Sequence, residues 1–103
     1  MALRFEIRFS DSADENLDWF SKRDKQLILD ELFRQLTYEP DVETKRRKKL
    51  KSSKLATWEL RIGDFRVFYD ITASVALEPY VEIVAIGEKT HNVLMIAGEE
   101  VKP

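Results

Sequence analysis

A Gly63–Asp64 pair between two runs of alternating apolar and polar residues constrains the fold of this chain more than any other feature. Glycine can take the positive φ that a tight two-residue turn requires, so the pattern predicts a β-hairpin. A two-residue turn sets Ile62 opposite Phe65 and Arg61 opposite Arg66. One face of the hairpin is then wholly apolar and is the predicted core face: Trp58, Leu60, Ile62, Phe65, Val67, Tyr69 and Ile71.

The other face of the hairpin carries Glu59, Arg61, Arg66, Phe68 and Asp70. Two arginines directly opposite each other destabilise a strand pair by up to about 1 kcal/mol. Two explanations are open at this stage. The carboxylates of Glu59 and Asp70 offset the repulsion, or a polyanion binds to this face.

The chain before the hairpin predicts one strand and two helices. Residues 3–9 alternate strictly and predict a half-buried strand. Ser12 and Glu15 have the spacing of a capping box, which predicts the start of a short helix. A second helix, with Leu27, Ile28, Leu32, Gln35 and Leu36 along its apolar stripe, should follow a break at residues 21–24 and end before Pro40.

The chain after the hairpin predicts a central strand. Residues 80–86 form an almost continuous apolar run, typical of a strand with neighbours on both sides. A polar loop should follow over residues 88–92, and then residues 93–96 as a short strand or helical turn. The element order predicts an α+β domain in which two N-terminal helices pack on one face of a small, mostly antiparallel sheet.

Length and composition narrow the class of protein. We expect residues 1–103 to form one domain, because the chain is too short for a second core. The sequence has no cysteine and a single histidine, so we expect no metal site, and we expect no cofactor. It has no apolar run long enough to span a membrane, and its first residues do not resemble a signal peptide. The absence of cysteine suits a reducing compartment, so we expect a cytoplasmic protein.

A basic segment, residues 45–54, precedes the hairpin. It holds seven of the 17 basic residues and no acidic residue, although the net charge of the chain is −2. Such a density is typical of a phosphate-binding patch, and a solvated loop is the alternative. As a patch, it would hold a nucleic-acid backbone through Lys48, Lys49, Lys51 and Lys54.

The chain resembles the RelE/ParE superfamily, the small toxins of type II toxin–antitoxin modules, along residues 3–98. The resemblance is carried by the strand–helix–helix–three-strand order, the hairpin of residues 58–71, and the Val-Ala-Ile-Gly-Glu-Lys-Thr-His-Asn segment of residues 84–92. It implies a β-α-α-β-β-β fold and an antitoxin partner that wraps the toxin, with a possible larger complex on operator DNA. RelE-like members cleave mRNA on the ribosome, whereas ParE-like members poison DNA gyrase and are not nucleases.

The resemblance also implies roles for individual residues. Arg66 matches the arginine that contacts the scissile phosphate in cleaving members, and Arg61 and Lys89 match further basic positions. His91 lies in a loop where some relatives have a catalytic histidine. Two positions differ from the ribosome-dependent members: Glu59 stands where these often have lysine, and Met95 where some have a catalytic tyrosine.

These residue types suit RNA cleavage by the ribose 2′-OH. Glu59 is a candidate base, Arg61 and Arg66 are candidate phosphate clamps, Lys89 is a further cation, and His91 is a candidate acid or base. We expect Phe68 to be exposed on the same face, where it could stack on a base as an RNA-binding residue; the alternative is that it lies under the C-terminal segment as ordinary core. Equally, the charged residues could be cross-strand ion pairs and His91 an incidental loop residue.

Three functions follow from these observations. The first is a RelE-like toxin that cleaves mRNA, with the ribosome and mRNA as partners in addition to an antitoxin. The second is a ParE-like inhibitor of DNA gyrase. The third is an inactive member that acts as an antitoxin-binding co-repressor.

Overall fold

The predicted hairpin lies at the centre of the sheet in the computed structural model, which describes residues 3–73 and 78–102. Strand β3 (Trp58–Ile62) pairs with β4 (Phe65–Thr72) in the expected register, including Arg61 opposite Arg66. Gly63 in the turn has a φ of +57°, as the hairpin prediction requires. The predicted core face is confirmed, because its seven apolar side chains all belong to or pack against one buried cluster.

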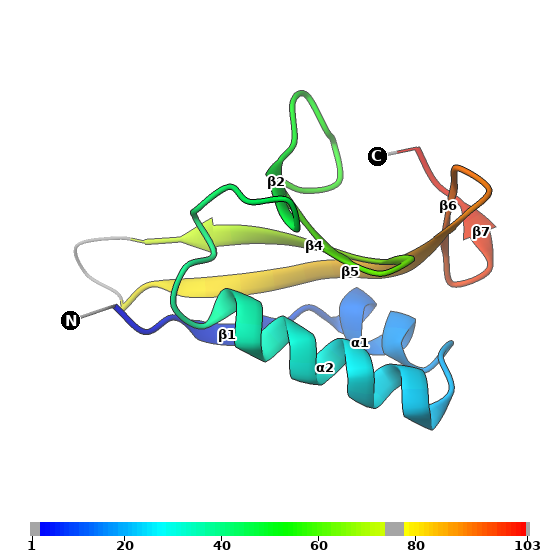
Figure 1. The fold of residues 1–103 in the computed structure, drawn as a ribbon, viewed down its shortest axis with the longest axis horizontal. Coiled ribbons are helices and arrows are strands. Elements are labelled where there is room, and N and C mark those ends of the chain that lie inside the picture. Colours follow the sequence, from blue (N-terminus) through cyan, green and yellow to red (C-terminus); the bar gives the residue numbers. More distant parts are fainter. Residues whose placement is uncertain (1–2, 74–77, 103) are drawn as a thin grey trace.

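The remaining elements surround this hairpin in a two-layer arrangement (Figure 1). They are β1 (Glu6–Phe9), α1 (Asp11–Leu17), α2 (Lys22–Leu36), β2 (Arg47–Lys49), β5 (Tyr80–Thr90), β6 (Val93–Ile96) and β7 (Glu99–Glu100). The sheet runs in the order β2-β3-β4-β5-β6-β7, and β1 pairs with β5 in parallel. Both helices lie on the same face of this mostly antiparallel sheet (Figure 1), so the predicted fold class is confirmed.

Strand β5 is interior, as its apolar run predicts. It pairs with β4 along one side, and with β1 and then β6 along the other. The strand is longer than expected and runs to Thr90, so the predicted polar loop reduces to a two-residue turn at His91 and Asn92. Two short strands were not expected from the sequence: β2, inside the basic segment, and β7.

The two helices begin at serine caps. Ser10, not the predicted Ser12, caps α1: its Oγ accepts the amide of Ala13 at 3.1 Å. Ser21 caps α2 in the same way through the amide of Asp24, and α2 ends before Pro40 as predicted. The apolar stripe of α2 is narrower than expected, because Ile28, Leu32 and Leu36 are fully buried while Leu27 is 51% exposed.

Helix α1 is attached to β5 along the stretch of its edge that lies between the segments paired with β1 and with β6. The Oγ of Ser10 donates to the carbonyl of Val84 at 3.0 Å, and the amide of Ile86 donates to Oδ1 of buried Asn16 at 3.0 Å. These bonds satisfy main-chain groups of β5 in the interval between the β1 and β6 ladders. Helix α1 therefore completes the sheet edge as well as covering the core.

The main core fills the space between the helices and the sheet. Tyr69 is fully buried there and donates its hydroxyl to the carbonyl of Pro40 at 2.7 Å. Burial raises the pKa of Tyr69 above its ordinary value, since the ionised phenolate would be desolvated. No helix among residues 3–73 and 78–102 is long and apolar enough to cross a membrane.

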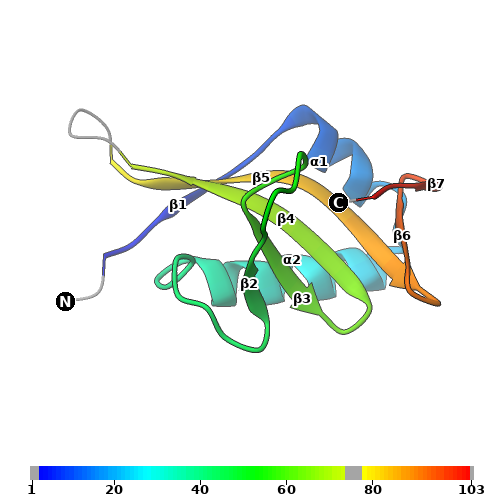
Figure 2. The same cartoon turned by 90° about the horizontal axis from the view of Figure 1, so that it is seen from above.

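A smaller apolar cluster lies on the opposite face of the sheet. Its buried members are Ala56, Phe68, Ala85 and Leu94. The loop of residues 50–57 and the C-terminal segment rise on either side of this face, away from the helices (Figures 1 and 2). We call this face of the sheet the open face; the hairpin residues Glu59, Arg61, Arg66 and Phe68 lie on it.

Candidate functional site

A cavity of about 190 Å³ lies on the open face, between the sheet and the C-terminal segment. Strands β3 and β4 form its floor with Glu59, Arg66 and Phe68. Its other residues come from the end of β5 and from the chain that follows: Lys89, Asn92, Val93, Leu94, Glu100, Val101 and Lys102. Three candidate catalytic residues, Glu59, Arg66 and Lys89, therefore border one cavity, and the candidate RNA-binding residue Phe68 lies in its floor.

Glu59 lies between the two facing arginines. Its Oε1 accepts Nε of Arg61 at 2.8 Å and lies 3.6 Å from Nε of Arg66. The Glu59 side chain is only 11% exposed. Of the two explanations for the facing arginines, the structure supports the first: the carboxylate of Glu59 offsets their repulsion. Asp70 plays no part in it, because its Oδ1 accepts the amide of Thr57 at 2.7 Å.

The guanidinium of Arg66 is held on two sides. Its Nη1 donates to the carbonyls of Gly63 at 2.6 Å and Phe65 at 2.9 Å, while Nε faces Glu59. The side chain is 15% exposed, against 46% for Arg61. None of the hydrogen bonds among residues 3–73 and 78–102 uses Nη2 of Arg66, so this nitrogen can still donate to a ligand.

Gly87 allows the C-terminal segment to approach this site. It pairs with Arg66 in the β4–β5 ladder, so its missing side chain would lie on the open face. A Cβ there would lie 2.5 Å from the carbonyl oxygen of Met95 and 2.7 Å from Cγ1 of Ile96. Strand β6 therefore crosses directly over Gly87, which brings the chain after it to the cavity.

Lys89 reaches the cavity because β5 extends past Gly87. Its amide donates to the carbonyl of Asp64 at 2.7 Å, which ties the end of β5 to the hairpin turn. His91 is exposed in the next turn and does not line the cavity, although its neighbour Asn92 does. Met95 pairs with Glu88 rather than with Lys89, so it belongs to the other face of the sheet.

The expectation that Phe68 is exposed is wrong. Its side chain has no solvent-accessible surface, because it lies within the small apolar cluster together with Leu94 and Val101. It supports the cavity floor but cannot stack on a base in this arrangement. The alternative prediction, which placed Phe68 under the C-terminal segment, is the one that the structure bears out.

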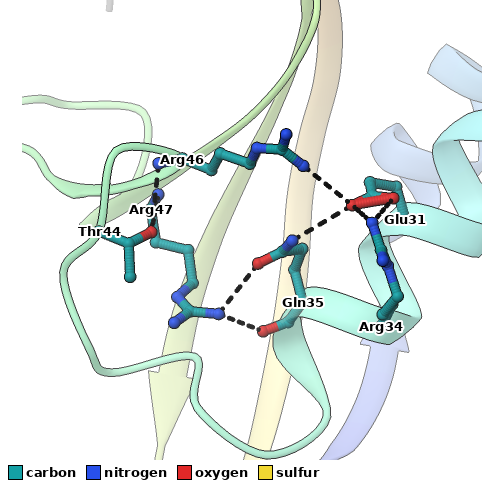
Figure 3. Close-up of polar contacts among 6 residues, drawn as sticks. All are labelled: Glu31, Arg34, Gln35, Thr44, Arg46 and Arg47. Atoms are coloured by element: carbon teal, nitrogen blue, oxygen red, sulfur yellow. Dashed lines mark hydrogen bonds and ion pairs between the residues drawn. The ribbon is translucent and has the colours of Figure 1, made fainter.

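The two arginines of the basic segment contact other parts of the chain (Figure 3). Arg47 is buried, and it donates to the carbonyls of Val42 and Gln35 at 2.9 Å each. Nη1 of Arg46 lies 3.4 Å from Oε1 of Glu31 on α2. Arg34, through its hydrogen bond, and Arg46 lower the pKa of Glu31 below its ordinary value.

The lysines of the basic segment are placed differently. Lys48 lies directly opposite Glu59 in the β2–β3 ladder and so belongs to the open face. Lys49 lies opposite Trp58, on the helix side of the sheet, but is exposed. Lys51 and Lys54 are exposed in the loop beyond β2. Unlike Arg46 and Arg47, these four lysines form no ion pair with any of the described residues.

Sequence reasoning missed the residues that the C-terminal segment brings to the cavity, chiefly Glu100 and Lys102. The one available signal was Gly87, because glycine inside a strand often marks a close approach of another backbone. Within the ranges 3–73 and 78–102, no group of three histidine, aspartate or glutamate side chains could hold a metal ion. The charged groups of the site are guanidinium, ammonium and carboxylate groups.

Comparisons with known proteins add one finding. No protein-family model matches the chain, and a search of curated proteins found no match. A chain of the toxin–antitoxin complex RelBE2 from Mycobacterium tuberculosis has a similar structure, with a TM-score of 0.70. The chain has a RelE-like fold. The two sequences are 22% identical, and the match covers 84% of this chain and 99% of the other. The RelE-like fold agrees with the family resemblance drawn from the sequence. Of the candidate catalytic residues drawn from the sequence, Arg66, Lys89 and Glu59 meet at the cavity on the open face.

Proposed function

We propose that this chain is the toxin of a type II toxin–antitoxin module and that it cleaves mRNA on the ribosome. The RelE-like fold supports the toxin role. The observation that carries the proposed chemistry is the half-buried Arg66, which borders a cavity together with Lys89 and Glu59. A cavity of this kind suits one phosphodiester group of an RNA backbone.

Arg66 is the proposed phosphate clamp. Its Nη1 is tied to two main-chain carbonyls, so the guanidinium does not have to be ordered when a phosphate arrives. A cation that is already in place stabilises charge as it develops on the reacting phosphate, and such fixed charges often contribute most to catalysis. Lys89 and Lys102 border the same cavity and add positive charge.

Glu59 is the proposed base. In metal-free RNA cleavage, the ribose 2′-oxygen loses its proton, attacks the adjacent phosphorus and displaces the 5′-oxygen, leaving a 2′,3′-cyclic phosphate. Glu59 lies on the cavity floor, and no hydrogen bond among the described residues uses its Oε2. This oxygen would accept the 2′ proton, and Lys89 at the cavity rim would protonate the departing 5′-oxygen.

The non-cleaving alternative has an observation in its favour. Oε1 of Glu59 is already paired with Arg61 and lies near Arg66, and His91 is outside the cavity. A site of this kind could bind a partner without cutting it. The alternative functions are therefore inhibition of DNA gyrase and service as an antitoxin-binding co-repressor.

Induced expression in bacterial cells separates these functions. Primer extension on a reporter mRNA should show cuts in phase with the codons if the chain is a ribosome-dependent nuclease. Intact transcripts together with DNA breaks and an SOS response would replace the proposal with gyrase inhibition. Normal growth without mRNA cuts or DNA breaks would favour the third function, an inactive antitoxin-binding co-repressor.

Replacing Arg66 by alanine tests the site itself. Arg66→Ala should abolish the mRNA cuts, because the cavity loses its fixed cation. It should cost only about 1 kcal/mol of folding stability, typical of the removal of a few hydrogen bonds near the surface. Arg34→Ala is the matched control, since Arg34 is an exposed arginine on α2 with one acidic partner. An Arg66→Ala protein that still cuts mRNA, or one that is unfolded, would show that the role of Arg66 is misassigned.

The proposal also implies a cognate antitoxin, a cytoplasmic location, and a toxin–antitoxin complex that could bind operator DNA. A small acidic protein encoded in the neighbouring reading frame is the expected antitoxin. Co-expression of the two should restore growth and give a complex that purifies as one species. Failure of every neighbouring product to bind the chain would count against the module.

A further inference from the structure

Trp19 is an exposed aromatic residue that contacts the C-terminal segment. Its side chain lies in the connection between α1 and α2 and is 63% exposed. A Cβ built on Gly98 would lie 2.9 Å from Cη2 and 3.0 Å from Cζ3 of Trp19. The turn between β6 and β7 therefore rests directly on the indole ring, at the end of the molecule where the α1–α2 connection lies (Figure 1).

The backbone that carries Trp19 is held in place. The amide of Trp19 donates to the carbonyl of Asn16 at 3.1 Å, and the side chain of Asn16 binds the amide of Ile86 in β5. On the other side, the ring of Phe20 meets that of Phe65 edge-on, with centroids 5.4 Å apart. The indole of Trp19 thus projects from a connection that is attached to both β5 and β4.

The segment that rests on Trp19 forms one wall of the cavity. Ala97 and Gly98 make the turn with φ values of +51° and +79°. Strand β7 then pairs with β6, and the amide of Val101 donates to the carbonyl of Leu94 at 2.9 Å. Beyond the turn, the cavity wall consists of Glu100, Val101 and Lys102.

We propose that Trp19 is a positioning residue for the cavity on the open face. It acts from the helix connection through Gly98, and it holds the β6–β7 hairpin so that Lys102 and Glu100 stay beside Arg66. Its effect on RNA binding rests on the function proposed above, whereas its effect on the hairpin does not. Because the ring is mostly exposed, its removal should loosen this hairpin without disturbing the main core.

Amide hydrogen exchange in the full chain tests the structural part. In Trp19→Ala, exchange at Val101 should become faster by roughly three- to tenfold, the range that one aromatic contact accounts for. Exchange at Ile86, whose amide binds Asn16, should stay unchanged. Trp19→Phe should protect Val101 less than Trp19 does, because the contact with Gly98 is made by Cη2 and Cζ3 at the far edge of the indole, which the shorter phenylalanine ring does not reach.

Two further variants complete the test. Gly98→Ala should also accelerate exchange at Val101, since a side chain there meets the indole and the φ of +79° is strained. Tyr38→Ala is the control, because Tyr38 is a comparably exposed aromatic at 52% and follows the other end of α2. Unchanged exchange at Val101 in Trp19→Ala, or an equal acceleration at Ile86, would overturn the proposal.

Binding of a short single-stranded RNA with 2′-O-methyl groups, which cannot be cleaved, tests the functional part. Trp19→Ala should weaken its binding by roughly three- to tenfold, in parallel with the exchange at Val101, and Trp19→Phe should weaken it too, to the extent that it loosens Val101. If Val101 is loosened and RNA affinity does not change, the wall does not contribute to the site and this part is wrong. If the unmodified chain binds no RNA, the proposed function fails, while the exchange data still decide the role of Trp19.

Discussion

The two faces of the β3–β4 hairpin differ in what their side chains contact. Among the described residues, fourteen buried apolar residues form the cluster on the helix face, against four in the cluster on the open face. Apolar burial stabilises in proportion to area, so most of the folding free energy comes from the helix face. The open face can therefore hold a buried carboxylate, two facing arginines and a cavity at modest cost in stability.

The largest effect should follow from a deletion on the helix face. Leu60→Ala removes a fully buried side chain from the main cluster. It should lower the free energy of unfolding by about 2–5 kcal/mol, measured by urea denaturation. Leu27→Ala, which truncates a leucine that is 51% exposed on α2, should change it by about 0.5 kcal/mol or less. Equal losses in the two variants would show that the main core is not where the structure places it.

An intermediate effect should separate two neighbouring arginines of the basic segment. Arg47 is 8% exposed and binds main-chain oxygens, whereas the side chain of Arg46 is 60% exposed and pairs with Glu31. Arg47→Ala leaves two partly buried main-chain carbonyls without this donor and removes a buried side chain, and it should cost about 1.5–3 kcal/mol. Arg46→Ala should cost about 1 kcal/mol or less, because exposed ion pairs contribute little.

Thermal or urea unfolding of both arginine variants gives the comparison directly. A larger loss for Arg46→Ala would mean that the basic segment is attached to α2 mainly through Glu31. A negligible loss for both would mean that β2 does not depend on either arginine. Either result would contradict the assignment of Arg47 as the structural arginine and Arg46 as the solvated arginine of the basic segment.

The central sheet could be predicted from the sequence because its signals are local. A tight Gly63 turn and strict alternation determined the register of β3 and β4, and one apolar run identified β5 as interior. The helix-side core followed from the same alternation. Helix caps were less certain: Ser12 had the capping-box spacing, but Ser10, which also binds the carbonyl of Val84, is the cap.

The remaining parts of the site depend on contacts between distant segments. Phe68 faces away from the main core, and it is fully buried because the loop of residues 50–57 and the C-terminal segment both pack against it. Arg47 lies in a run of basic residues that predicts solvation, yet it alternates with Lys48 onto the helix side of the sheet. Similarly, no local pattern marks Asn16, whose partner Ile86 is 70 residues away.

The smallest effect on stability, and a clear effect on binding, should come from the lysines of the basic segment. Replacing Lys48, Lys49, Lys51 and Lys54 by glutamine removes charges that pair with no carboxylate among the described residues, so each change should alter stability by about 0.5 kcal/mol or less. If these lysines follow an RNA backbone, the slope of log affinity against log salt should fall by about 0.7 for each phosphate that is no longer neutralised. The matched control neutralises four charges on α2: Lys22, Arg23, Lys25 and Arg34. A similar flattening in both proteins would show that only net charge matters, whereas flattening in the first alone would extend the binding surface of the open face to the basic segment.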